Sequence, residues 1–388
     1  MNIFPLQNYE LQNSSYLFQY GPTVGTFDFR TKLAEFLTKG YKAKVEAADL
    51  VLTAGATYGL HMILSTLIDF DGFVFIDAVT YMIALEAIAE FPTLKIIPVK
   101  LNDDGVDLKD LEEKLKEKKF DPKAKMFWGI YYTIPTFHNP TGILFSDGKF
   151  TKIDSHDFLT CECFTEIQQA LIKVARKYEI LIACDDVYNL LPFDSDTPPK
   201  RLYAYDSFDD EDFKGHVISN GTFSKLLSPG VRVGWMECAP RITKAFRHSG
   251  ILKSGGAINN YTSGVVASLI ELGLAESQLK KCLGAYKTQR DALCDVLDQC
   301  LPSSCSFIKP KGGYFIWIKL PEDCDGGAVS DYCTKNYKVF CIKGTRFSIE
   351  NKFRNFVRLS FAFHPPAVLS EAGRKLCLGI NEYLNISK

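Results

Sequence analysis

Long hydrophobic runs are missing from this sequence. No segment has the 18 or more consecutive apolar residues typical of a membrane-spanning helix, and the start, MNIFPLQNYELQNSS, has neither the basic beginning nor the apolar stretch of a secretory signal. An excess of one charge is missing too, because 45 Lys and Arg stand against 46 Asp and Glu. Such a balance gives no electrostatic reason to expect nucleic acid or an anionic membrane as a partner. We therefore expect neither partner.

A metal-binding pattern is also missing. The twelve cysteines and six histidines are scattered, and there is no CxxC pair. The CxC at Cys161 and Cys163 has poor spacing for zinc without a second pair nearby. Scattered cysteines are typical of reduced thiols, so the sequence predicts a cytoplasmic protein without a resident metal.

The sequence does have the length for two domains and a regular alternation of patterns. Its 388 residues, 46% of them hydrophobic, are enough for a large core. From about residue 50, short apolar runs alternate with amphipathic stretches, which indicates strand–helix–strand units and a mostly parallel sheet. We expect strands at 72–79, 95–101, 125–134, 180–186 and 216–223, and helices at 58–70, 108–119 and 165–178.

The last third of the chain has a different pattern. A long helical pattern at about 264–300 precedes three strand-like segments, 312–320, 339–344 and 355–363, which favours a smaller α+β domain. Residues 144–164 fit neither pattern, and we interpret them as a surface insertion.

Two loop motifs follow apolar runs. GATYG, residues 55–59, precedes a helical pattern, so free backbone N–H groups at a helix N-terminus would suit a phosphate. HNPTG, residues 138–142, has strong turn residues and puts Asn139 at the carboxyl end of a strand, where ligands bind in open α/β sheets. A plain helix entry and an ordinary loop are the alternative interpretations.

Charged residues gather in two further motifs. In CDDVY, residues 184–188, two adjacent carboxylates end a buried strand and need a cation or a metal as partner, although no histidine or second acidic cluster has suitable spacing for a metal. In TFSKLLSPGVRVG, residues 222–234, hydroxyl groups and Arg232 suit a phosphate, and Lys225 is either another phosphate contact or a nucleophile. Taken singly, these could be turn residues or solvated surface charges.

In their order along the chain, these motifs and NFVRLSFAF, residues 355–363, resemble the class I and II aminotransferases, which are fold-type I enzymes that use pyridoxal 5′-phosphate. The resemblance runs from about Tyr20 to the C-terminus. The spacing of Lys225 and Arg232, with QYGPTVGTFDFR (19–30) and KSGGAINNYTSGVVAS (253–268), is similar to the branch of 2-aminoadipate and kynurenine aminotransferases.

This resemblance implies an α/β fold in three parts. A large cofactor-binding domain, residues 29–262, would hold a mostly parallel seven-stranded sheet between helices and would carry the insertion at 144–164. A smaller α+β domain would comprise residues 263–388. An N-terminal segment, residues 1–28, would pack with the small domain and with a partner subunit.

The resemblance also implies the catalytic roles. Lys225 binds the cofactor covalently and then moves a proton between substrate and cofactor. Asp185, in preference to Asp186, pairs with the pyridine nitrogen and so keeps the ring able to accept electrons. Asn139 and Tyr188 form hydrogen bonds to the 3′-oxygen of the cofactor. Among cations, Lys225 should have a lowered pKa.

The remaining roles concern binding. The phosphate would be held by Gly55, Ala56, Thr57, Thr222 and Arg232, with Tyr20 reaching the phosphate of the neighbouring subunit. Ala56 stands where relatives often have serine, which removes one hydroxyl. Tyr81 matches an aromatic residue that stacks on the cofactor ring. Arg358 matches the arginine that binds the substrate carboxylate, and Gly25 and Asn139 are further expected substrate contacts.

The implied activity moves an amino group from an α-amino acid, which could be 2-aminoadipate-like, aromatic or another, to a 2-oxo acid such as 2-oxoglutarate. The enzyme would be a homodimer with shared active sites. A lyase or decarboxylase is the first alternative, because the same cofactor supports those reactions. An effector-binding domain like that of the MocR regulators is less favoured, because no basic helix-turn-helix pattern precedes the QYGP motif.

Overall fold

A mostly parallel sheet forms the centre of the larger part of the molecule, as the sequence predicts. The computed structural model describes residues 16–145 and 166–386. Within these residues the seven-stranded sheet has the order β1-β9-β8-β7-β6-β2-β3. Strand β9 is antiparallel to β1 and β8, and the other neighbours are parallel. The strands are β1 (Leu50–Thr53), β2 (Ile68–Asp77), β3 (Lys95–Val99), β6 (Phe127–Thr133), β7 (Leu181–Asp185), β8 (Val217–Thr222) and β9 (Gly234–Cys238).

Helices cover both faces of this sheet because successive strand residues point to opposite sides. In β2, Val74 and Ile76 enter one hydrophobic core, whereas Phe73 and Phe75 enter the other. The first core is completed by α2 (Phe27–Tyr41), α3 (Ala56–Leu67), α4 (Met82–Ala89), α7 (Pro240–Arg247), α8 (Gly250–Lys253) and α9 (Asn260–Glu271). The second is completed by α5 (Leu108–Lys118) and α6 (Glu166–Tyr178).

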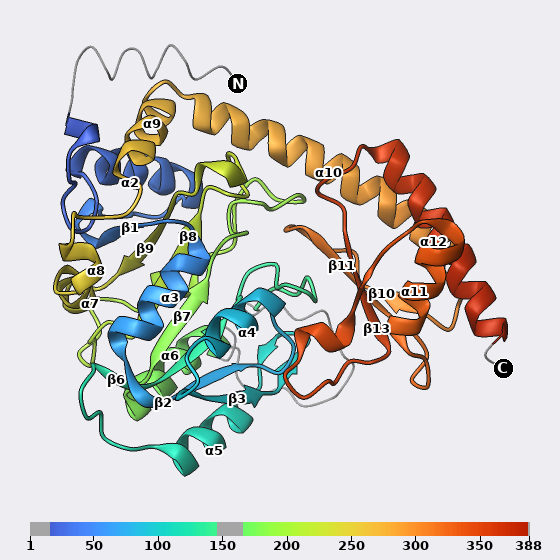
Figure 1. Ribbon diagram of the computed structural model, residues 1–388, viewed down its shortest axis with the longest axis horizontal. Coiled ribbons are helices and arrows are strands. Elements are labelled where there is room, and N and C mark those ends of the chain that lie inside the picture. Colours follow the sequence, from blue (N-terminus) through green and yellow to red (C-terminus); the bar gives the residue numbers. More distant parts are fainter. Residues whose placement is uncertain (1–15, 146–165, 387–388) are drawn as a thin grey trace, which may run out of the picture.

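A smaller antiparallel sheet lies beside the large one, with its own core (Figure 1). Its order is β10-β11-β13-β12. The long helix α10 runs from the end of α9 to this second part of the molecule (Figure 1). The elements are α10 (Leu274–Cys300), β10 (Ser306–Phe307), β11 (Phe315–Lys319), α11 (Gly326–Tyr337), β12 (Ile342–Lys343), β13 (Phe356–Ser360) and α12 (Pro366–Ile386), and a separate hairpin is formed by β4 (Leu101–Asn102) and β5 (Gly105–Val106).

Two expected helix boundaries were wrong. The segment predicted as a helix at 58–70 changes to strand at Ile68, where α3 passes directly into β2. The helical pattern at about 264–300 is two helices, because Gly273 adopts a left-handed conformation between α9 and α10, with φ of 68°. The expected domain boundary at 262/263 falls inside α9.

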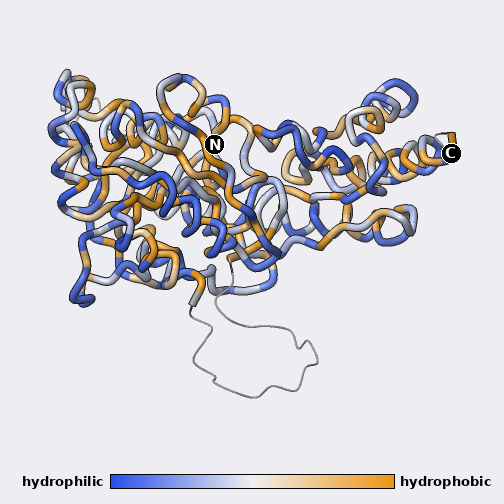
Figure 2. Tube along the Cα trace, turned by 90° about the horizontal axis from the view of Figure 1, so that it is seen from below, coloured by the Kyte–Doolittle hydropathy of each residue, from blue (hydrophilic) through white to orange (hydrophobic). Residues whose placement is uncertain are grey.

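The expected insertion at 144–164 lies outside the described residues except for its first two. Of these, Phe145 belongs to the core under α5 and α6, and its backbone N–H binds the carbonyl of Pro135. Hydrophilic and hydrophobic stretches alternate along the described chain (Figure 2). Across the described residues, no helix has the length and hydrophobicity needed to cross a membrane.

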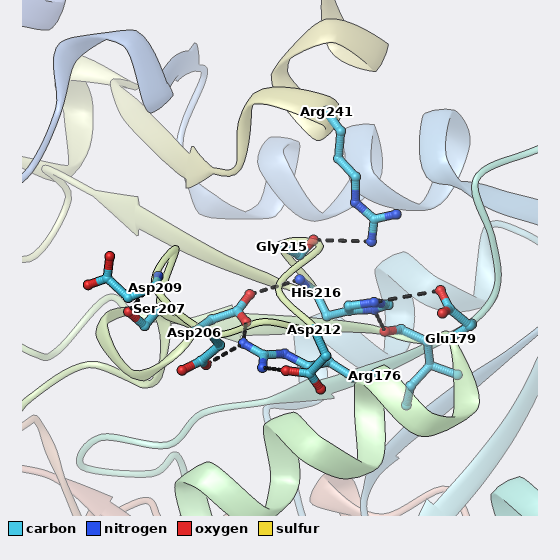
Figure 3. Close-up of polar contacts among 11 residues, drawn as sticks. Arg176, Glu179, Asp206, Ser207, Asp209, Asp212, Gly215, His216 and Arg241 are labelled. Carbon is cyan, nitrogen blue, oxygen red and sulfur yellow. Dashed lines mark hydrogen bonds and ion pairs between the residues drawn. The ribbon is translucent and has the colours of Figure 1, made fainter.

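A buried polar network lies at the end of the large sheet where β7 and β8 begin (Figure 3). Arg176 of α6 forms an ion pair of 2.6 Å with Asp206, which also accepts the backbone N–H of His216 at 2.8 Å. The ring of His216 in turn binds the carbonyl of Ile180. These bonds hold α6 and the starts of β7 and β8 together. They thereby fix the position of β7 relative to β8, and with it the position of CDDVY relative to TFSK at the carboxyl ends of the two strands.

Candidate active site

A cavity of about 370 Å³ lies where the carboxyl ends of β6, β7 and β8 face the smaller sheet. Three cationic side chains and one carboxylate line it, which gives the cavity an excess of positive charge suited to an anionic ligand. The lining residues are Ala56, Thr57, Tyr81, Met82, Ile134, Asn139, Asp185, Val187, Tyr188, Thr222, Ser224, Lys225, Pro229, Arg232, Phe315 and Arg358.

One end of the cavity is the N-terminus of α3. Gly55 caps this helix with φ of 95°, a conformation that glycine adopts without strain. A Cβ at Gly55 would lie 2.8 Å from Nη2 of Arg232, so the glycine also lets the guanidinium approach the helix end. Arg232 donates to the hydroxyl of Ser224 at 3.3 Å, and that hydroxyl lies 3.0 Å from the hydroxyl of Thr222. Backbone N–H groups, hydroxyls and a guanidinium therefore converge at this end.

The adjacent carboxylates of CDDVY point to different environments. Asp185 lines the cavity and accepts the hydroxyl of Tyr132 at 2.7 Å, while its Oδ1 is buried and has no hydrogen-bond partner in the described residues. Burial, together with the neighbouring Asp186, raises the pKa of Asp185 to about 6. Asp186 instead accepts the hydroxyl of Ser219. The structure thus aims Asp185, the residue preferred from the motif, at the cavity.

Lys225 lies on the loop between β8 and β9, partly buried in the cavity wall. Burial lowers the pKa of its ammonium, and the positive charges of Arg358 and Arg232 act in the same direction against the opposite influence of Asp185. The expected lowered pKa is confirmed, with burial as its main cause. A larger fraction of Lys225 is therefore an uncharged amine near neutral pH than of a solvated lysine.

Arg358 of β13 faces the cavity from the smaller sheet. Its Nη1 donates to Oδ1 of Asn139 at 2.9 Å, and its guanidinium carbon lies 3.9 Å from the centroid of the Phe315 ring. Burial lowers the pKa of Arg358 to about 10, and its buried Nε has no partner among the described residues. The guanidinium thus lies over an aromatic ring, with donor capacity left unused.

Two tyrosines, Tyr81 and Tyr188, also line the cavity. Tyr81 is the N-cap residue of α4, and Tyr188 follows β7. Burial raises the pKa of both phenols, and the negative charge of Asp185 adds to the effect. Both hydroxyls therefore keep their protons at neutral pH.

The structure leaves two of the expected residues away from the cavity. Tyr20 has 88% of its surface exposed in this single chain, and its ring lies beside Gly255. Gly25 packs on Leu52 and accepts a hydrogen bond from Arg30. The expected substrate contact of Gly25 and the expected reach of Tyr20 stay predictions.

Sequence reasoning missed several residues of the site. Ile134, which lines the cavity, and Tyr132, which donates to Asp185, belong to the segment 125–134, whose strand pattern was recognised without a role in the site. Met82 follows Tyr81, and Phe315 begins β11. The two glycines before Tyr314 could have pointed to Phe315, because glycines in a strand often mark a place where another backbone or a ligand approaches closely.

The comparisons with known proteins agree with this geometry. A family model described as Aminotransferase class I and II matches residues 6–160 and 165–376. The aromatic-amino-acid aminotransferase 1 of Thermococcus litoralis is 29% identical over 366 residues, which cover 94% of this chain and 80% of that protein. The 2-aminoadipate transaminase of Thermus thermophilus is 25% identical over 360 residues, covering 92% and 80%.

Solved structures show the same likeness in three dimensions. A crystal structure of Pyrococcus horikoshii kynurenine aminotransferase, described as a complex with PMP with KYN as substrate and KYA as product, has 28% identity and a TM-score of 0.81. The match covers 98% of this chain and 87% of that one. With a family model that spans most of the sequence and a fold shared along its length, the chain belongs to the class I and II aminotransferases, enzymes that depend on pyridoxal 5′-phosphate.

Proposed function

We propose that this aminotransferase moves the amino group of an aromatic or 2-aminoadipate-like α-amino acid to a 2-oxo acid such as 2-oxoglutarate. The observation that carries the proposal is that Lys225, Asp185 and Arg358 line one cavity. Their chemistry is complementary: an amine with a lowered pKa, a buried carboxylate and a guanidinium with a free donor.

The residues present fit pyridoxal 5′-phosphate. The unpartnered Oδ1 of Asp185 can accept the proton of a pyridinium nitrogen, which would offset the cost of burying this carboxylate. The N-terminus of α3, with Thr222, Ser224 and Arg232, can hold a phosphate dianion. When bound, the cofactor supplies an aldehyde that takes up the amino group and a ring that accepts electrons.

Lys225 would carry the proton. An uncharged Nζ can attack a carbonyl carbon, and later it can take a proton from the substrate Cα and return one. Its protonation depends on burial and on three charged neighbours. Burial and the cations Arg232 and Arg358 lower the pKa of Lys225, whereas Asp185 raises it. A substrate carboxylate on Arg358 would reduce that cation's influence, so Lys225 would become more basic when substrate binds.

Arg358 would bind the α-carboxylate that every amino acid and 2-oxo acid carries. A guanidinium binds a carboxylate with two parallel hydrogen bonds, and the contacts with the ring of Phe315 and the amide of Asn139 restrain the side chain of Arg358. Because the site is buried, the pair would form largely out of water, where it discriminates strongly against ligands without a carboxylate.

The donor would be selected by the apolar part of the wall. Met82, Ile134 and Phe315 offer apolar surface in the same cavity as Arg358, which favours a large apolar or aromatic side chain over a small polar one. The relative named aromatic-amino-acid aminotransferase agrees with this selection, whereas a 2-aminoadipate-like donor is supported by the name of the second relative and not by the apolar wall.

The test is a donor panel with 2-oxoglutarate as acceptor. Aromatic amino acids, kynurenine, 2-aminoadipate and leucine should convert the cofactor to its amine form, and 2-oxoglutarate should restore the aldehyde form, as followed by absorbance. Turnover that releases ammonia or CO₂ without forming the amine form would instead identify a lyase or a decarboxylase. Serine and glycine serve as small controls and should react least.

The same proposal includes a homodimer. In the described residues, Phe18, Tyr20 and Phe27 expose 56%, 88% and 71% of their surfaces near α2 and α9, and Tyr20 follows a segment bound by Asn260. We expect Tyr20 to reach the phosphate of the partner. Sedimentation equilibrium should give a dimer, and Tyr20→Ala should weaken cofactor affinity. Phe363→Ala, which removes an aromatic ring that is 84% exposed on the other domain, is the matched control.

A cytoplasmic location is the last part of the proposal. In the described residues all ten cysteines are free, and eight of them are buried. Reduced thiols of this kind suit a reducing compartment. Cell fractionation should find the protein with cytoplasmic markers, and recovery with an organelle or a membrane fraction would contradict the assignment.

A further inference from the structure

A tyrosine that is not among the lining residues of the cavity, Tyr314, contacts Lys225. The hydroxyl of Tyr314 lies 3.2 Å from the carbonyl oxygen of Lys225 and 2.9 Å from the hydroxyl of Tyr286 on α10. The Nζ of Lys225 lies 5.3 Å from the centroid of the Tyr314 ring. One side chain thus contacts both the backbone and the ammonium of the lysine.

The hydroxyl of Tyr314 has a single proton and two acceptors within reach. These are the carbonyl oxygen of Lys225 and the hydroxyl of Tyr286. Burial raises the pKa of both phenols, so they keep their protons at neutral pH. The two hydroxyls therefore connect α10 to the backbone of Lys225.

The backbone before Tyr314 is itself fixed. Gly313 has φ of 75°, and a Cβ there would lie 2.8 Å from Cβ of Phe137; a Cβ at Gly312 would lie 2.4 Å from the carbonyl oxygen of Leu191. The two glycines therefore let this segment pack directly against the loops that follow β6 and β7. The rings of Tyr188 and Tyr286 lie 5.5 Å and 5.0 Å from the ring of Tyr314 and limit its rotation.

We propose that Tyr314 is a positioning residue for Lys225, with its hydroxyl fixing the lysine backbone and its ring holding the ammonium toward the cavity. The inference rests on the proposed role of Lys225 as proton carrier. A lysine side chain has four rotatable bonds. Restraint of its backbone and of its ammonium reduces the number of conformers, so a larger fraction has Nζ within reach of the substrate. Tyr286 acts through Tyr314 and joins this restraint to α10.

The experiment separates the hydroxyl from the ring. Tyr314→Phe removes the hydroxyl and keeps the ring, Tyr314→Leu removes both, and Tyr286→Phe removes the hydroxyl that contacts Tyr314. Tyr332→Phe is the matched control, because its hydroxyl binds Glu382 within the smaller domain. Two quantities are measured: the rate and KM of the amino-acid half-reaction, and the pH dependence with which the cofactor-free protein captures pyridoxal phosphate.

Loss of the hydroxyl should slow the half-reaction about three- to tenfold, the range of one hydrogen bond, with less than a twofold change in KM. Tyr286→Phe should give a smaller decrease than Tyr314→Phe. The midpoint of the capture profile should stay in place in Tyr314→Phe and move down by about half a pH unit in Tyr314→Leu, because an aromatic ring favours the protonated ammonium. Tyr332→Phe should match wild type in both quantities.

A Tyr314→Phe variant with the wild-type half-reaction rate would overturn the role of the hydroxyl, and an unchanged capture midpoint in Tyr314→Leu would overturn the role of the ring. The measurement of pyridoxal phosphate capture does not require the enzyme to turn over substrate. If wild type captures pyridoxal phosphate at Lys225 but transfers no amino group, the proposed function fails, while the shift in capture midpoint still decides the role of Tyr314.

Discussion

Replacing Asp185 with Asn should change stability in opposite directions in the cofactor-free and the loaded protein. Asp185 is buried, and its pKa is raised from 3.8 to about 6, which means that its ionised form is costly in the folded state. Two pKa units correspond to about 3 kcal/mol. Asn is nearly isosteric and can still accept the hydroxyl of Tyr132, so the variant loses the charge without losing this hydrogen bond.

The pH dependence follows from the sign of the shift. Between pH 4 and 6 the folded protein holds a proton on Asp185 that the unfolded chain has released, so the stability of wild type falls as pH rises through this window. Asp185→Asn should therefore match wild type at pH 4 and should be more stable by up to about 3 kcal/mol at pH 7.5. Urea unfolding of the cofactor-free proteins at both pH values measures the difference.

Loading with pyridoxal phosphate should reverse the order. A pyridinium nitrogen paired with the carboxylate would offset the cost of ionisation in wild type, whereas the amide of the variant would offer the nitrogen no charge. The cofactor should thus raise the melting temperature of wild type more than that of the variant, and the variant should be nearly inactive. Asp186→Asn is the matched control: the pKa of Asp186 is also raised to about 6 by burial, but its carboxylate binds Ser219. A cofactor-free Asp185→Asn protein less stable than wild type at pH 7.5 would refute this reasoning.

Three further changes test other parts of the site. Lys225→Ala should lower turnover at least a thousandfold while phosphate-end contacts still bind the cofactor, as measured by steady-state kinetics and fluorescence titration. Arg358→Ala should lower kcat/KM for donor and acceptor alike, by a factor equivalent to about 2–5 kcal/mol, with cofactor affinity unchanged. Arg358→Lys should recover part of the loss. An Arg358→Ala variant that loses the cofactor but has normal kinetics with its substrates would refute the assignment. Gly55→Ala should weaken cofactor affinity about tenfold, because the backbone has φ of 95°, and should leave the rate at saturating cofactor near wild type; equal affinity would contradict the phosphate site.

Patterns local in the sequence predicted the fold and most of the site. Apolar runs identified β6, β7 and β8, and the motifs at their carboxyl ends meet in one cavity because parallel strands end at the same edge of a sheet. The alternation in NFVRLSFAF predicted that Arg358 lies on the face opposite Val357 and Leu359. In the structure Arg358 lines the cavity, whereas Val357 belongs to the core of the smaller domain.

Features that depend on distant residues were beyond sequence reasoning. No turn residue marks the change from α3 to β2, and Asp69 at that point is held by the backbone N–H groups of Lys123, Ala124 and Lys125, more than fifty residues away. Tyr132 reaches Asp185 because β6 and β7 are neighbours, a pairing that the sequence alone does not reveal. The break at Gly273 was visible as a glycine but was outweighed by the helical pattern on both sides.

The most direct test of the account is to locate the covalent bond to the cofactor. The protein is loaded with pyridoxal phosphate, reduced with borohydride, digested and mapped by mass spectrometry. We predict that the phosphopyridoxyl group is found on the peptide that contains Lys225, and that a donor amino acid added before reduction prevents the attachment. Attachment to any other lysine, such as Lys253, or no attachment at all in a protein that still transfers amino groups, would contradict the central claim.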